Sequence, residues 1–280
     1  ITLAKFLAIS GIILPMLPHK NLIPDINLTP YSIWLATVVV SGISYLSYLL
    51  KRYVFHESGT LVSGIIGGLY SSTATISVLA RKSRKASEQE ATDYVAAMLL
   101  AVSMMFLRFM ILILIFSREI FLSIYPYLLT MAVVAAIVAW FIHSRQKRPE
   151  GQSAETEEDD SSNPLEFKVA LIFAVLFVIF TFLTHYTLVY AGTGGLNLLS
   201  FVSGFSDITP FILNLLQNTG SVAALIITAC SMQAIISNIM VNMFYALFFA
   251  GKGSKLRPWI LGGFGVVIVC NLVLLLFFYI

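Results

Sequence analysis

Two short segments of the sequence place hydroxyls, glycines and a carboxylate inside long apolar stretches. The first, SGIIGGLYSSTAT at 63–75, contains three glycines, three serines and two threonines. Glycine lets a helix leave regular geometry, and hydroxyls can satisfy the backbone groups that a break exposes. We therefore expect a discontinuous helix that binds an ion or a polar solute. The candidate ligands are the side chains of Ser71, Ser72, Thr73 and Thr75.

The second segment, SGFSDITPFILN at 203–214, adds an acidic side chain. Asp207 occupies the position that corresponds to Ser71, and Pro210 removes a helix hydrogen bond soon after it. A carboxylate at the bilayer centre costs on the order of 3 kcal/mol or more unless it is paired or hydrated. A bound cation or a transferable proton would offset this cost. We predict Asp207 as a coupling or metal-coordinating carboxylate, with Thr209 and Asn214 as neutral ligands.

Arg108, in MMFLRFMILI, is a second charge expected within the membrane. An ion pair between Asp207 and Arg108 would explain both residues structurally. Alternatively, the long Arg108 side chain snorkels to the interface, or it binds an anionic substrate. The sequence leaves these interpretations open.

A third polar cluster lies in CSMQAIISNIMVN at 230–242. Its polar side chains recur at roughly helical spacing, which puts several of them on one face. Neutral amides and hydroxyls in such a place either hold helices together or coordinate a solute. From this cluster we take Gln233 and Asn238 as candidate ligands.

All these segments need a membrane around them. Of the 280 residues, 58% are hydrophobic and 11% are charged, so the apolar excess does not fit a water-soluble core. A helix needs about 20 apolar residues to cross roughly 30 Å of hydrocarbon. The expected fold is all-α, a polytopic transmembrane helix bundle of about nine segments. These lie near 2–17, 30–50, 60–80, 93–116, 121–142, 166–190, 196–216, 221–250 and 258–280.

A charged stretch, 143–165, predicts a disordered cytoplasmic linker between two transmembrane halves. The first half, 1–142, holds an extra helix and one repeat, and 166–280 holds the other repeat. A shift of 136 residues relates them, and duplicated halves around a midplane site are a common transporter plan. The shift lays Gly59, Gly68, Thr73, Ile76 and Leu79 onto Gly195, Gly204, Thr209, Ile212 and Leu215.

The distribution of positive charge tests this topology. Nine crossings put nine basic residues on the linker side and seven on the other, which is a weak bias, and they make the two halves parallel. If 221–250 were re-entrant, the three basic residues at 252–257 would join the cytoplasmic side, giving twelve against four. A re-entrant segment would also make the halves inverted.

The order of the motifs resembles a known family. GIIGGLYSSTATISVLARKSRK, NPLEFKVAL, GLNLLSFVSGFSDITPFIL and SNIMVNMFYALFFAGK look like the C-terminal membrane domain of unknown function found in MgtC/SapB-family bacterial proteins. The resemblance implies a multi-pass protein of the bacterial inner (cytoplasmic) membrane, an N-terminal MgtC-like domain absent from this chain, and cation handling. Thr209 and Asn242 replace an acid and a lysine that are usual there, which weakens a multi-carboxylate metal site.

Our leading hypothesis is membrane transport of a small ion, with a cation favoured, or of a polar solute, at a midplane site between two broken-helix repeats. The alternative is a non-transporting regulatory or scaffolding membrane protein whose small-residue motifs are helix-packing seams. The chain has no GxxxxGK[ST] loop, HExxH or CxxC, so we expect neither an enzyme nor a cofactor. The expected partners are the lipid bilayer, the ion or solute and a second copy of the chain in a homodimer, but no nucleic acid.

Overall fold

A computed structural model describes residues 10–24, 26, 28–54, 59–84, 86, 88–145, 167–217, 222–251 and 254–279. This part of the chain is all-helical, and its β-structure is limited to an isolated bridge between Ile23 and Ile26. The expected all-α class is confirmed. Most of the predicted linker, 143–165, lies outside the described residues.

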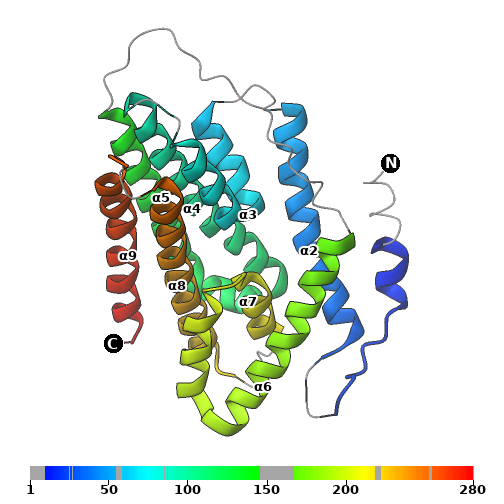
Figure 1. The fold of residues 1–280 in the computed structure, drawn as a ribbon. Helices are drawn as coiled ribbons and strands as arrows, with labels where there is room; N and C mark the ends of the chain where they lie inside the picture. Colours follow the sequence, from blue (N-terminus) through cyan, green and yellow to red (C-terminus); the bar gives the residue numbers. More distant parts are fainter. Residues whose placement is uncertain are drawn as a thin grey trace. The chain divides into compact units, whose positions relative to one another are not determined.

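The helices are long enough and apolar enough to form a membrane bundle (Figure 1). In the part of the chain that the structure describes, seven helices have the length and composition of a membrane span, and α7 is shorter. The chain is therefore a multi-pass membrane protein. The helices are α2 (Pro30–Leu49), the π-helix η1 (Leu50–Val54), α3 (Thr60–Lys82), α4 (Glu88–Phe116), α5 (Arg118–Ser144), α6 (Phe167–Ser203), α7 (Ile208–Gln217), α8 (Ala224–Ala250) and α9 (Arg257–Tyr279).

The helices form two compact units that interleave along the sequence. Unit 1 comprises the described residues within Ile1–Tyr45, Leu112–Ser123 and Ser161–Ser237. Unit 2 comprises those within Leu46–Ile111, Ile124–Asp160 and Asn238–Ile280. The division of the sequence into the halves 1–142 and 166–280 follows the repeat rather than these packing units, and it stays a prediction.

In unit 2, the first part of α3 packs closely along α4. A Cβ atom added to Gly64 would lie 2.3 Å from the carbonyl oxygen of Ala97, and one added to Gly68 would lie 2.5 Å from the Cα of Ala101. Both contacts advance by four residues on each helix, so the two helices run in the same direction with their backbones touching. This is the close packing that small residues permit between membrane helices.

The short connection to α4 requires α3 to fold back on itself. A straight α3 would put Lys82 about 20 Å beyond Gly68 along α4, whereas Glu88 begins α4 about 20 Å before Ala101. The two ends would then be about 40 Å apart, which is more than the roughly 20 Å that the connecting residues 83–87 can span. The second part of α3 must therefore return toward the start of α4.

The backbone shows where α3 turns. Ser71 has φ −158° and ψ 107°, outside helical geometry, and the residues on either side of it are helical. The Thr75 side chain reaches back to Gly67, where an added Cβ would lie 2.5 Å from Thr75 Oγ1. Residues eight apart on a straight helix would be about 12 Å apart. Thus α3 is a helical hairpin that turns at Ser71.

Unit 1 contains a second break, at Gly192. Its φ of 59° and ψ of −151° suit glycine but not residues with a Cβ, so α6 consists of two helices that meet there. This matches the predicted separation of 166–190 from 196–216. The first part of α6 packs on α7, because the rings of Phe180 and Phe211 are 5.7 Å apart and Asn214 Nδ2 donates to Thr181 Oγ1 at 2.6 Å.

The second part of α6 runs alongside α8 in the same direction. Cys230 Sγ contacts Asn197 Oδ1 at 3.5 Å, and Ser237 Oγ donates to the carbonyl of Phe201 at 2.6 Å. Ala224, the first residue of α8, therefore lies level with the start of this helix. Only residues 218–223 connect α7 to α8, and they span at most about 25 Å. The end of α7 must therefore lie near the start of α8, so α7 runs back along the second part of α6. The second part of α6 and α7 form another helical hairpin.

The two hairpins support the predicted internal duplication. In the first repeat α2, the α3 hairpin, α4 and α5 follow one another, and in the second the first part of α6, the hairpin, α8 and α9 do so. The breaks fall at Ser71 and at 204–207, which correspond under the shift of 136 residues. The sequence predicts single crossings for 60–80 and 196–216, but both segments turn back half-way.

The glycine seam between α3 and α4 gives a stability test. We expect Gly68→Ala to lower the midpoint of thermal unfolding in detergent, because its methyl would meet the Ala101 backbone and overpacking costs about 1–3 kcal/mol. Gly262→Ala, on α9, is the matched control, since nothing lies within 4 Å of its added Cβ. Equal stability of the two variants would contradict the seam.

Candidate functional site

At the tip of the first hairpin, side chains replace the helix hydrogen bonds that the break removes. Ser71 Oγ accepts a hydrogen bond from the amide of Ala74 at 3.3 Å, so Ser71 acts as an N-cap for the second part of α3. The carbonyl of Tyr70, at the end of the first part, accepts a hydrogen bond from Arg108 Nη1 at 2.7 Å. Each of the two ends that meet at the tip therefore has a side-chain partner.

The contact with Tyr70 gives Arg108 a structural role inside the membrane. The side chain is buried, and its positive charge lies at the negative end of a half-helix, where the helix dipole favours a cation. Arg108 belongs to unit 2 and Asp207 to unit 1. The ion pair between them stays a prediction.

The tip of the second hairpin is built in the same way. Asp207 Oδ1 accepts a hydrogen bond from the amide of Thr209 at 2.9 Å, so Asp207 acts as an N-cap for α7. Its carboxylate is exposed and lies at the positive end of the α7 dipole. On the side before the turn, the carbonyls of Phe201, Val202 and Ser203 accept hydrogen bonds from the amides of Gly204, Phe205 and Ser206. The Ser237 hydroxyl of α8 also donates to the Phe201 carbonyl, which ties α8 to the second part of α6 before the tip.

The remaining predicted ligands of the first hairpin line its turn. Ser72 is buried, and Thr73 is half-buried, with its carbonyl accepting a hydrogen bond from Ser77 at 2.8 Å. Thr75 fills the space beside Gly67. The structure thus brings these residues together with Ser71 and Arg108, as parts of one tip.

The other predicted ligands are spread along unit 1 and α8. Thr209 and Asn214 are buried on α7, and Asn214 bonds to Thr181. Asn238, buried on α8, accepts a hydrogen bond from Asn242 at 3.1 Å. Thr181 was not among the predicted ligands. Thr181 and Thr184 are three residues apart, and this spacing indicates that their hydroxyls lie on one face of the helix.

Five buried side-chain oxygens in unit 1 have no hydrogen-bond partner within the described part of the chain. An unsatisfied buried polar group costs about 1–3 kcal/mol, so these atoms are places where an ion or a water would be stabilised. Among the described residues, no three His, Cys, Asp or Glu side chains gather as a metal site. The five are Ser10 Oγ, Thr184 Oγ1, Thr228 Oγ1, Ser231 Oγ and Gln233 Oε1.

The family described as "Domain of unknown function (DUF4010)" matches residues 38–250. The chain belongs to this family. The DUF4010 match begins within α2 and ends with α8, so it covers both hairpins. A protein of Aquifex aeolicus (strain VF5), named "Uncharacterized protein", is 25% identical over 227 residues, which cover 79% of this chain and 96% of that protein. No solved structure matches the chain. Neither match names an MgtC/SapB-like domain, so that resemblance stays a prediction.

The N-cap at Ser71 can be tested without removing a charge. We expect Ser71→Ala to lower the unfolding free energy by about 1 kcal/mol, because the Ala74 amide loses its acceptor. Ser71→Asn keeps an acceptor of comparable quality and should stay near the wild-type value. Denaturation of the purified protein in detergent measures both. A loss of equal size in the two variants would count against the cap.

Proposed function

We propose that this DUF4010 protein transports a small ion, with a cation favoured, or a small polar solute, and that its broken helices supply the binding groups. The observation that carries the proposal is the pair of helix breaks at the corresponding residues Ser71 and Asp207. Irregular backbone within the hydrocarbon is tolerated where it is buried in protein or lines a cavity. Broken helices in duplicated halves are a common way to build a midplane site.

The length of α7 supports a position for Asp207 well inside the bilayer. Its 10 residues extend about 15 Å, roughly half of the hydrocarbon thickness. At the other end of α7, Gln217 Nε2 contacts the carbonyl of Ser32 at 3.4 Å, next to the start of α2. Since the start of a spanning helix lies near a membrane face, the opposite end of α7 lies deep in the membrane.

The order of crossings supports inverted repeats. Between the two hairpins the chain has three expected crossings, α4, α5 and the first part of α6, and an odd number of crossings predicts inverted repeats. Arg84 donates to the carbonyls of Phe248 and Phe249, which puts the ends of α3 and α8 at the same face. A topology with nine crossings would separate these ends, whereas one with re-entrant hairpins keeps them together.

The basic residues follow this topology. Thirteen of the 17 Lys and Arg residues lie in or next to the connections after α2, α3, α5 and α8, which share one face. Lys20 and Arg118 lie at the opposite face, Arg108 lies within the membrane, and Lys5 is outside the described residues. This is a stronger bias than nine against seven, and it assigns the basic face to the cytoplasm. We propose the bacterial inner membrane as the location, in line with the MgtC/SapB resemblance.

The charges favour a cation over an anion. Arg108 donates to the Tyr70 carbonyl, so its guanidinium already serves a helix end. The Asp207 carboxylate is exposed, and unit 1 also holds the unpartnered oxygens of Thr228, Ser231 and Gln233. Carboxylate and neutral oxygens are ligands for hard cations. Ser72 and Thr73, on the first hairpin, stay predicted ligands.

One observation favours the alternative of a scaffolding protein without transport. Gly64 and Gly68 form a packing seam with Ala97 and Ala101, so two of the small residues near the first break have a purely structural role. The seam does not extend to Asp207. We retain transport as the proposed function, and we propose no enzymatic activity.

Substitutions at Asp207 separate the charge from the cap. We expect Asp207→Asn to abolish cation-dependent uptake into proteoliposomes while leaving thermal stability near wild type, because asparagine caps a helix as well as aspartate does. Asp207→Ala should lose both uptake and about 1 kcal/mol of stability. Glu119→Gln, an exposed acid at the start of α5, is the control and should keep its uptake. Normal uptake by Asp207→Asn would remove the carboxylate from the mechanism.

The unpartnered oxygens give a second test. In the absence of metal cations we expect Ser231→Ala and Thr228→Val to be as stable as wild type or more so, because each removes a buried oxygen without a protein partner. Adding the transported cation should raise the melting temperature of wild type but raise that of these variants less. Thermal unfolding across a series of Li⁺, Na⁺, K⁺ and Mg²⁺ salts measures this. Equal shifts in wild type and variants would show that these oxygens do not bind the ion.

A further inference from the structure

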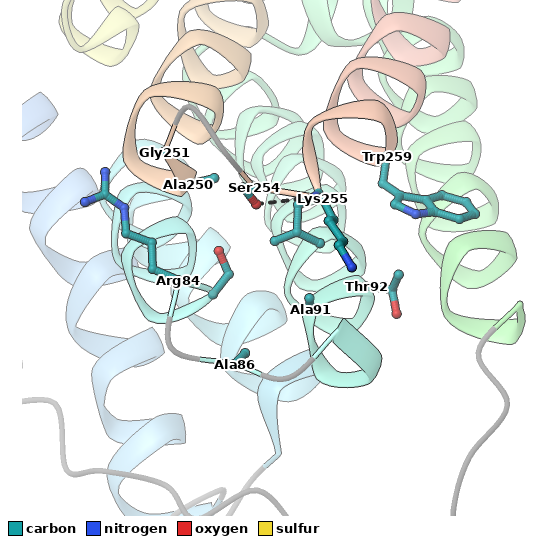
Figure 2. A pocket seen from close by; sticks show the side chains of 11 residues that line it. Arg84, Ala86, Ala91, Thr92, Ala250, Gly251, Ser254, Lys255 and Trp259 are labelled. Atoms are coloured by element: carbon teal, nitrogen blue, oxygen red, sulfur yellow. Dashed lines mark hydrogen bonds between the residues drawn. The ribbon is translucent and has the colours of Figure 1, made fainter.

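A hollow of about 1020 Å³ opens at one end of unit 2, away from the hairpin turn (Figure 2). It lies between the connection from α3 to α4 and the connection from α8 to α9. Arg84 lines it on one side, and Lys255 and Trp259 line it on the other. Lys255 extends toward Ala91 and Thr92 at the start of α4.

The wall formed by Arg84 is fixed by contacts with the end of α8. Its guanidinium donates to the carbonyls of Phe248, at 3.1 Å, and Phe249. Gly251, with φ 91°, then turns the chain sharply beside it. Arg81 lies over the Phe249 ring, 4.3 Å from its centroid. The basic wall is therefore part of the helix-end structure rather than a loose surface charge.

The hollow is electropositive. The segments 81–93 and 251–257 together contain seven basic and three acidic residues. The described lining residues include two basic side chains and no acidic one. The N-terminal ends of α4 and α9 border the hollow and add the positive ends of their dipoles. These features together suit a phosphate group.

We propose that this hollow binds the headgroup phosphate of an anionic phospholipid. It lies where the α3 hairpin and the spanning helices α4, α8 and α9 end, which is the depth of lipid headgroups, and Trp259 is of the residue type that favours this interface. Basic pockets between membrane helices on the cytoplasmic side are suited to anionic headgroups. The apolar surface below, which includes the exposed Phe244 and Phe248 of α8, can accommodate the acyl chains. This site is independent of the transport proposal.

The three tryptophans of the chain allow a direct measurement. In a Trp34→Phe/Trp140→Phe background only Trp259 fluoresces. The protein is reconstituted in vesicles of phosphatidylcholine mixed with brominated phosphatidylglycerol or with brominated phosphatidylcholine. We expect Trp259 quenching to give an affinity at least about fivefold higher for phosphatidylglycerol, since each nearby basic residue contributes roughly that factor at an anionic lipid surface.

Variants and competition identify the source of the phosphate. Lys255→Gln and Ala86→Glu should bring the preference close to one, whereas Arg118→Gln, a basic residue outside the hollow, should leave it unchanged. Ala86→Glu adds a carboxylate without touching the Arg84 contacts, so it keeps the test valid if Lys255→Gln misfolds. Equal quenching by both lipids, or a preference that survives in a folded variant, would overturn the proposal. Loss of the preference in excess inorganic phosphate would instead identify free phosphate as the ligand and also overturn it.

Discussion

A helix broken inside hydrocarbon must find partners for its freed backbone groups within the protein. Each unsatisfied amide or carbonyl there costs several kcal/mol, and no water is present to replace the lost bond. In both hairpins the amide side is satisfied from within the hairpin, by Ser71 or Asp207. On the carbonyl side, Arg108 of the following helix donates to Tyr70 in the first hairpin, whereas amides of the turn itself, those of Gly204, Phe205 and Ser206, donate in the second. The positions of the polar residues follow from this requirement.

The same requirement explains how the two repeats differ. The first combines a neutral cap, Ser71, with a cationic donor, Arg108, and the second combines an anionic cap, Asp207, with carbonyls that bond to amides of the turn itself. Each tip therefore carries one charged side chain, and each charge lies at the dipole end that favours its sign. An internal duplication can diverge in this way without weakening either hairpin, because hydrogen bonding is preserved when the charge is moved.

Much of this arrangement could be predicted from the sequence. The apolar spans, the breaks within 63–75 and 203–214 and the correspondence of Ser71 with Asp207 all follow from composition and spacing. The hairpins could not, because a hydropathy window of about 19 residues averages two half-helices into one span. The reversal of the chain is shown by the contact of Gly68 with Ala101 and by the bond from Arg84 to α8. Both join residues that are distant in sequence. The capping role of Asp207 was equally hidden, since a pattern of residue types does not show which amide a carboxylate bonds.

The capping role of Asp207 also restricts how an ion could act on the hairpin. Its Oδ1 holds the Thr209 amide, while a carboxylate has a second oxygen with free lone pairs. A metal ion on that second oxygen would keep the cap and add ligands around the tip. A proton would remove the negative charge from the positive end of α7 and weaken the hydrogen bond, because a charged acceptor binds more strongly than a neutral one. Metal binding would therefore stabilise the turn and protonation would loosen it, so the two ions have opposite structural effects through one carboxylate.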